Sequence, residues 1–89
     1  MKQFTYRIGD ENGMHARPAG KLATYAKRFV SEISVSANGK QADGKRLLSL
    51  MSLGAAKGTA LEFTITGEDE EQACRTLLRF CEENLNGGE

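Results

Sequence analysis

The chain has 89 residues, with 12 basic and 12 acidic side chains, one histidine and no formal net charge at neutral pH. This length predicts one domain spanning residues 1–89. Balanced charge disfavours DNA or RNA as the main partner, because neutralising phosphates requires a basic excess. No apolar run approaches the roughly 20 residues of a membrane helix, and the first residues lack the apolar core of a signal peptide. We therefore expect a cytoplasmic protein without membrane insertion.

The first quarter of the chain changes from a strand pattern to a helix pattern. Apolar and polar residues alternate over 4–8, which predicts a half-buried strand, and a polar loop follows at 9–13. Residues 16–29 have apolar positions at helical spacing and predict a helix. Its apolar stripe is Ala19, Leu22, Ala23, Ala26 and Val30. Because a residue before proline avoids helical backbone angles, Arg17 is expected to be the last non-helical residue.

The middle of the chain predicts a hairpin and a short helix. A second alternating segment covers residues 33–37, and Asn38-Gly39 after it is the strongest short hairpin signal. A strand at 40–43 should therefore fold back on the preceding one. The apolar segment 47–53, closed by a glycine, predicts a short helix with Asp43 as its cap.

The last third predicts a strand and a helix. Residues 61–65 alternate, and the acidic run 68–71 suits the start of a final helix, where the helix dipole favours negative charge. Its expected buried stripe is Ala73, Leu77, Phe80, Cys81 and Leu85. The tail from Asn86 onward is expected to fray. The order β-α-β-β-α-β-α predicts an α+β fold, a four-stranded antiparallel sheet with three helices on one face and a polar opposite face.

The two cysteines, Cys74 and Cys81, stand seven residues apart in the last predicted helix. That spacing separates their Cα atoms by about 10.5 Å along a helix axis, which is beyond the reach of a disulfide. The chain has no CxxC pair and no second histidine, so it lacks the pattern of a zinc site. We expect two free, core-facing thiols and no bound metal.

The single histidine lies in Gly13-Met14-His15-Ala16-Arg17-Pro18-Ala19, at the start of the first predicted helix. An imidazole there can accept a phosphoryl group, because one ring nitrogen is unprotonated near neutral pH. The backbone N–H groups of Ala16 and Arg17 and the Arg17 guanidinium suit a bound phosphate. Pro18 needs no N–H in a first turn. The spacing alone is weak, and a lone histidine at a helix start is more often a cap or a surface residue.

Residues 13–19 resemble the active-site signature of the histidine-containing phosphocarrier protein (HPr) family of the bacterial phosphoenolpyruvate-dependent sugar phosphotransferase system. The likeness continues through Met51-Ser52-Leu53-Gly54-Ala55-Ala56-Lys57-Gly58 and Gly67-Glu68-Asp69-Glu70, and runs nearly end to end. It implies an open-faced β-sandwich and a phosphoryl carrier that is not itself an enzyme. His15 would accept the phosphoryl group on Nδ1 from enzyme I and pass it to enzyme IIA domains, with Arg17 stabilising the charge. The resemblance implies no cofactor for this chain.

The short helix predicted at 47–53 has five large apolar residues, more than one stripe can bury. Leu50 and Leu53 are expected to face the core. The residues left partly exposed would be Leu47, Leu48 and Met51. Either neighbouring segments wrap this helix, or its exposed residues form an apolar docking patch. The resemblance favours docking of enzyme I and enzyme IIA, with Thr24 and Lys27 of the first helix as the polar rim.

Arg46 departs from the family pattern. An ungapped match places it where many members from low-GC Gram-positive bacteria have a serine that a dedicated kinase phosphorylates. Arginine cannot accept that phosphate, and a cation near a helix N-terminus is unfavourable by about 0.3–1 kcal/mol. Ser49 and Ser52 lie inside the predicted helix and do not take over the role. The sequence therefore predicts a carrier without this serine switch.

Two other functions stay open at this point. One is an HPr-like paralogue in a regulatory phosphorelay, such as the nitrogen-linked one, which would differ in the enzyme IIA domain that drains its phosphate. The other is a small RNA-binding module, which the balanced charge and the lack of paired aromatics on an outward sheet face disfavour. We expect a monomer, because a small carrier must dock with two partners in turn. The sequence does not indicate which sugar the system transports.

Overall fold

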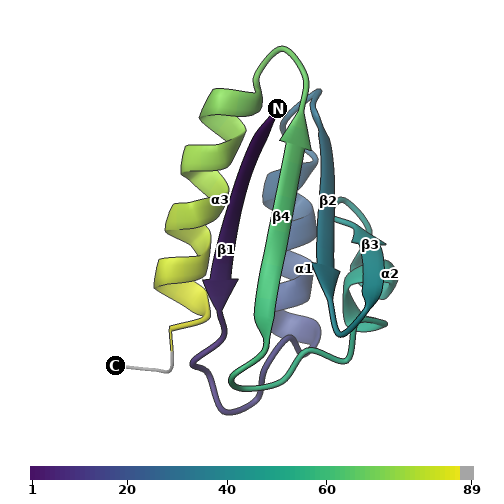
Figure 1. The fold of residues 1–89 in the computed structure, drawn as a ribbon, viewed down its shortest axis with the longest axis vertical. Helices are drawn as coiled ribbons and strands as arrows, with labels where there is room; N and C mark the ends of the chain where they lie inside the picture. Colours follow the sequence, from purple (N-terminus) through teal and green to yellow (C-terminus); the bar gives the residue numbers. More distant parts are fainter. Residues whose placement is uncertain (87–89) are drawn as a thin grey trace.

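A computed structural model describes residues 1–86 of the chain. Its elements are β1 (Lys2–Arg7), α1 (Ala16–Ala26), β2 (Glu32–Ala37), β3 (Lys40–Asp43), α2 (Leu47–Met51), β4 (Ala60–Thr66) and α3 (Glu70–Asn84). The predicted order of strands and helices is confirmed (Figure 1). The fraying expected for the tail falls mostly on residues 87–89, which lie outside the described residues.

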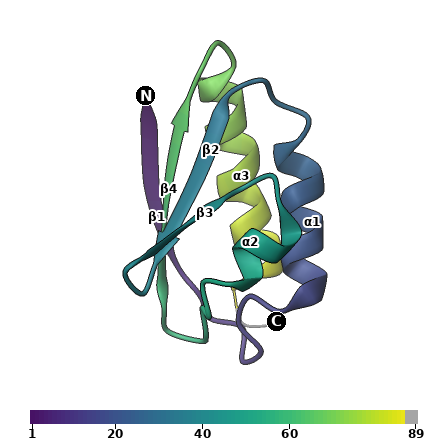
Figure 2. The same cartoon turned by 90° about the vertical axis from the view of Figure 1, so that its right-hand side faces the viewer.

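The four strands form one antiparallel sheet in the order β1-β4-β2-β3. All three helices cover the same face of this sheet, and the opposite face is open (Figure 2). β4 lies between β1 and β2, and its inward residues Leu61, Phe63 and Ile65 are fully buried. Phe63 is fully buried there and stacks on Phe4 of β1, with ring centroids 4.5 Å apart. The α+β fold with helices on one face is therefore confirmed.

The outer face of the sheet is polar, as predicted. Its exposed or half-buried residues include Thr5, Arg7, Ser34, Ser36, Glu62 and Thr64. On the inner face, the buried residues form one hydrophobic cluster to which all three helices contribute. The predicted stripe of α3 is buried in full.

The hairpin between β2 and β3 turns at Asn38 and Gly39, as the dipeptide predicted. Their φ values of 54° and 76° are both left-handed, which matches the twist of the two strands. The Asn38 side chain also donates a hydrogen bond to the Leu53 carbonyl over 3.0 Å. The turn therefore ties the sheet to the chain that follows α2.

The first helix ends earlier than predicted, at Ala26. Val30 is 74% exposed and does not belong to the buried stripe. The N–H groups of Val30 and Ser31 each donate a 3.0 Å hydrogen bond to the Asp69 carboxylate. This contact with the chain before α3 holds residues 30–31 out of the helix, so the helical pattern in the sequence overstates its length.

Asp43 does not cap α2, contrary to the prediction. The N-cap of α2 is Arg46, whose side chain makes no cap hydrogen bond. Asp43 instead accepts the Lys45 N–H through its carboxylate and the Arg46 N–H through its carbonyl, over 3.0 and 3.1 Å. Its carboxylate therefore closes a turn before the helix and is not available to the helix start.

Both cysteines are free, as predicted. Cys81 is buried and Cys74 is half-buried against the same core. Burial raises the pKa of Cys81 to about 12, so its sulfur stays a neutral thiol at physiological pH.

Candidate functional site

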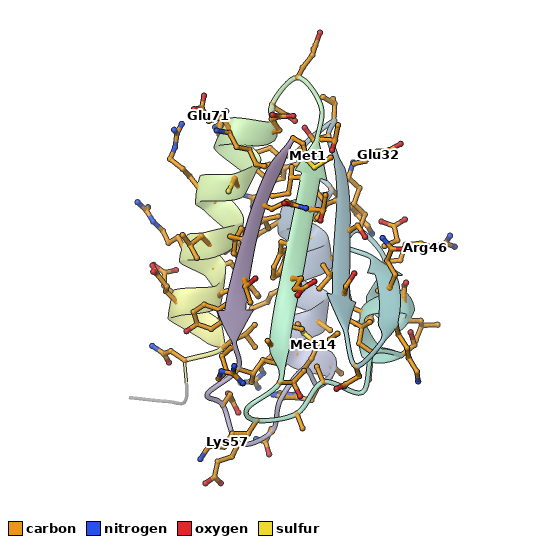
Figure 3. All side chains as sticks on the ribbon, viewed as in Figure 1. Met1, Met14, Glu32, Arg46, Lys57 and Glu71 are labelled. Carbon is orange, nitrogen blue, oxygen red and sulfur yellow. The ribbon has the colours of Figure 1, made fainter. Side chains whose placement is uncertain are left out.

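The loop before α1 is anchored to the chain that precedes β4. The Met14 N–H donates a 3.0 Å hydrogen bond to the Ala55 carbonyl. Gly13 has φ +65°, and a Cβ there would collide with the Ala55 carbonyl oxygen. Met14 is buried and points into the core near this junction (Figure 3). The glycine is therefore required for the close approach that fixes the position of the next residue.

His15 is the N-cap residue of α1, as predicted. Its backbone is extended, with φ −86° and ψ −173°, and its carbonyl accepts the Ala19 N–H over 3.0 Å. The imidazole makes no cap hydrogen bond and is half-buried. The alternative that its side chain caps the helix is therefore wrong, and the ring is left for another role.

Arg17 lies inside the helix, which begins at Ala16, and this corrects the prediction that it is non-helical. Pro18 and Ala19 are buried, so packing of the first turn outweighs the bias of a residue before proline. Within residues 1–86, the backbone N–H groups of Ala16 and Arg17 make no hydrogen bond. Pro18 has no N–H to offer, so these two donors form the open end of the helix.

A hollow of about 240 Å³ brings His15 and Arg17 together. Its other lining residues, not assigned to the site by sequence, are Asp10, Asn12, Pro18, Lys21 and Asn84. Lys21 could have been found, because it stands one helical turn beyond Arg17. Asn84 could not, because it comes from the end of α3, where the Leu85 carbonyl accepts the Gly9 N–H over 2.8 Å.

The hollow is rich in donors for an anion. Arg17 and Lys21 have no carboxylate within ion-pair distance in the part of the chain that the structure describes. Asp10 is the one acidic side chain in the lining, and it accepts the Asn12 N–H over 2.8 Å. Among residues 1–86, no three His, Cys, Asp or Glu side chains form a group that could hold a metal ion. An imidazole, a guanidinium and open helix amides together suit a group that becomes strongly negative.

The predicted exposure of α2 is confirmed. Leu50 and Leu53 are fully buried, whereas Leu47, Leu48 and Met51 are 39%, 78% and 39% exposed. α2 packs beside α1 (Figure 2), where Thr24 and Lys27 are exposed. We call the five residues Leu47, Leu48, Met51, Thr24 and Lys27 the docking patch. Arg46 is exposed at the start of α2 and extends outward from it (Figure 3).

His15 is thus a half-buried histidine at a helix start without a side-chain cap, with an arginine in the same hollow, an arrangement that suits a negatively charged group on the ring. The sequence model of the family described as "PTS HPr component phosphorylation site" matches residues 2–83. The chain therefore belongs to the HPr family, and it is a phosphoryl carrier of the phosphotransferase system. None of the helices in residues 1–86 is long and apolar enough to cross a membrane.

Similar proteins agree with this assignment. The chain is 39% identical over 80 residues to the phosphocarrier protein HPr of Buchnera aphidicola, which covers 90% of this chain and 94% of that protein. It is 42% identical over 73 residues to the multiphosphoryl transfer protein of Salmonella typhimurium, covering 79% of this chain and 19% of that protein. The solved histidine-containing phosphocarrier protein of Mycoplasma has a TM-score of 0.92 at 32% identity, covering 97% of this chain and all of that one.

Proposed function

We propose that His15 is the residue on which this carrier holds the phosphoryl group. One observation carries the proposal. The imidazole of His15, which makes no cap hydrogen bond, lies in one hollow with Arg17 at the N-terminus of α1. A ring nitrogen, Nδ1 by resemblance to the family, forms the bond to phosphorus as the donor's bond to phosphorus breaks. The same step in reverse, with a new acceptor, unloads the carrier.

Arg17 and the first helix amides stabilise the loaded state. A phosphoryl group on His15 brings nearly two negative charges to the start of α1. The N–H groups of Ala16 and Arg17 and the positive end of the helix dipole favour an anion there. The Arg17 guanidinium adds a charged, forked donor. These groups lower the free energy of the phosphorylated form without taking part in covalent chemistry.

The donor is enzyme I and the acceptors are enzyme IIA domains, both seated in turn on the docking patch. The exposed Leu48 and Met51 supply apolar contact, and Lys27 supplies charge at the rim. The chain acts as a monomeric, cytoplasmic carrier domain that is itself consumed and regenerated, so it is a substrate of its partners and not an enzyme. It needs no cofactor of its own.

Arg46 removes the serine switch that the resemblance associates with this place. A guanidinium at the N-cap of α2 cannot accept a phosphate, and Ser49 lies within the helix, where its hydroxyl accepts the Asp43 N–H over 2.9 Å. We expect no seryl phosphate after incubation with a serine kinase of the family and ATP. A phosphoserine located by peptide mass spectrometry at any position would contradict this.

The relay is tested by reconstitution. Phosphoenolpyruvate, magnesium, enzyme I and an enzyme IIA domain are mixed with and without this chain. The expected result is phosphorylated enzyme IIA only when the chain is present. Absence of transfer from a chain shown to be folded, with an enzyme I that loads a known HPr, would overturn the proposal. Transfer only to an enzyme IIA domain of the nitrogen-linked relay would assign the chain to that relay instead of sugar uptake.

A further inference from the structure

One carboxylate lies in the hollow that otherwise suits an anion. The hollow of about 240 Å³ is lined by His15, Arg17 and Lys21, and Asp10 is the one acidic residue that the described chain adds to this lining. Asp10 is half-buried. A phosphoryl group on His15 would bring nearly two negative charges into the same space, where a fixed negative charge repels it. The function proposed for His15 therefore does not by itself explain an acidic residue at this position.

Asp10 is held by hydrogen bonds on both sides of its backbone and at its side chain. Its N–H donates to the Leu85 carbonyl, just beyond α3, over 3.3 Å. Its carbonyl accepts the Gly13 N–H over 3.0 Å, and its carboxylate accepts the Asn12 N–H over 2.8 Å. The carboxylate is therefore fixed in the same loop that positions His15.

The turn at Asp10 requires a side-chain oxygen but not a charge. A side-chain oxygen that accepts the N–H two residues further on closes an Asx turn, and asparagine does this as well as aspartate. The next residue, Glu11, offers a contrast, because it does not line the hollow and its side chain is 86% exposed beside Lys57. The carboxylate of Asp10 therefore adds a negative charge to the hollow beyond what folding the loop requires.

The Asp10 carboxylate is close enough to act on a group carried by His15. A round hollow of about 240 Å³ is about 8 Å across, which does not exceed the Debye length at physiological ionic strength. Both residues line this hollow, so salt screens the interaction of their charges only in part. Repulsion between a carboxylate and a doubly charged phosphoryl group at this distance corresponds to about a fivefold change in an equilibrium constant.

We propose that Asp10 limits how tightly the carrier holds its phosphoryl group, and so keeps that group transferable to the next protein. The inference rests on the function proposed for His15. Arg17 and the first amides of α1 lower the free energy of the loaded form, whereas the Asp10 carboxylate raises it. A relay protein that held the group too strongly would be loaded but would not unload. The negative charge in the hollow therefore offsets part of the positive charge around it.

The equilibrium test uses Asp10→Asn, which removes the charge and keeps an oxygen that can accept the Asn12 N–H. Each chain is brought to equilibrium with enzyme I, magnesium and a fixed ratio of phosphoenolpyruvate to pyruvate, and the loaded fraction is measured by intact-protein mass spectrometry. We expect the ratio of loaded to unloaded chain to be about fivefold higher for the variant at low salt. At about 0.5 M salt the difference should shrink to less than about twofold, because salt screens the repulsion.

Two further variants separate the charge of Asp10 from its turn. Glu11→Gln removes an equal charge from the adjacent residue, which lies outside the hollow, and should leave the ratio of loaded to unloaded chain nearly unchanged. Asp10→Ala removes both the charge and the acceptor, and should raise the ratio as Asp10→Asn does. Equal effects of Asp10→Asn and Glu11→Gln, no effect of Asp10→Asn, or an effect of Asp10→Ala alone would overturn the proposal.

Binding of inorganic phosphate separates this inference from the proposed function. The labelled, unloaded chain is titrated with phosphate while the NMR shifts of the Ala16 and Arg17 amides are followed. Asp10→Asn should bind phosphate about threefold more tightly than the wild type, and Glu11→Gln should not, whether or not enzyme I loads His15. Equal affinity of the wild type and Asp10→Asn, or no shift at these amides in either chain, would overturn the inference even if loading occurs.

Discussion

The starts of α1 and α3 are built in opposite ways. α3 begins with Glu70 and Glu71 in its first turn, and the Glu70 carboxylate accepts the Gly67 N–H over 3.0 Å. Neither helix has a side-chain cap, but α1 has no acidic residue in its first turn, and its Ala16 and Arg17 amides make no hydrogen bond among the described residues. The first turn of α3 therefore carries its own negative charge, whereas the first turn of α1 carries none; we call them the filled start and the open start. The difference teaches that a helix end without acidic residues of its own keeps its positive dipole available to an added anion, which the function proposed for His15 requires.

The filled start also has a structural task. Ser31 is the one buried polar side chain in the described core, and its hydroxyl donates to the Asp69 carboxylate over 2.5 Å. A buried hydroxyl needs such a partner. At α1 the two residues with open amides, Ala16 and Arg17, are exposed, so solvent has access to their N–H groups. Leaving them free therefore costs little in the unloaded protein.

The largest effect is expected from Gly13→Ala, which breaks the anchor of the open start. A Cβ would meet the Ala55 carbonyl at a left-handed φ, so we expect a loss of about 3 kcal/mol in unfolding free energy, measured by urea denaturation. Gly20→Ala, a change inside α1, is the control. It adds a methyl group in open space and should stabilise by about 0.5–1 kcal/mol. Equal stability of the two variants would contradict the account of the loop.

The next effect concerns charge at the open start. Arg17→Ala should lower kcat/KM for loading about 30-fold, because a charged donor to the transferred group is lost. Arg17→Lys should restore only part of the rate, since an ammonium cannot form the forked contact. The rates are measured in the enzyme I assay with folding checked by circular dichroism. A full rate for Arg17→Ala would place the charge stabilisation elsewhere.

A smaller effect is expected at the docking patch, which brings partners to the open start. Met51→Asp should lower kcat/KM about tenfold with the fold intact, because a carboxylate replaces an apolar contact with the partner. Val30→Asp is the matched control, since Val30 is also exposed and apolar but lies outside the patch. An unchanged kcat/KM for Met51→Asp, or an equal loss for Val30→Asp, would contradict the docking assignment.

The smallest effect tests the filled start through pH. The Ser31 hydroxyl, followed by the Val30 and Ser31 amides, lowers the pKa of Asp69 below its usual 3.8. Its contribution to stability is therefore complete above pH 3.8 and is lost as the pH falls through the lower folded-state pKa. Asp69→Asn should weaken this acid dependence of the melting temperature. Parallel curves for wild type and variant between pH 5 and pH 2 would show that Asp69 contributes nothing to it.

Local patterns in the sequence were enough for most of the fold. The Asn38-Gly39 dipeptide predicted the hairpin turn, because both residues readily adopt left-handed backbone angles. The exposed leucines of α2 were predicted because a short helix with five large apolar residues cannot bury them all. The candidate site was predictable in the same way, because His15 and Arg17 are neighbours at one helix start. The docking role of α2 has no test in the fold itself and stays a proposal.

Local patterns could not predict features that depend on contacts between residues far apart in the sequence. The chain at Val30 and Ser31 is held by Asp69, which is far away in the sequence, so the pattern within residues 16–29 could not show that Val30 leaves the buried stripe. Asn84 joins the His15 hollow for a similar reason, since the end of α3 bonds to the loop at Gly9. Asp43 was misjudged for a local reason, because its carboxylate accepts the Lys45 N–H in a turn that precedes α2.

The location of the phosphate tests the central claim most directly. Wild-type chain and His15→Ala are incubated with phosphoenolpyruvate, magnesium and enzyme I, and then analysed by intact-protein mass spectrometry before and after mild acid. We predict one acid-labile phosphate on the wild type and none on the variant, with both chains folded. A phosphate that persists in His15→Ala, or one that survives acid, would contradict the assignment of the open helix start as the carrier site.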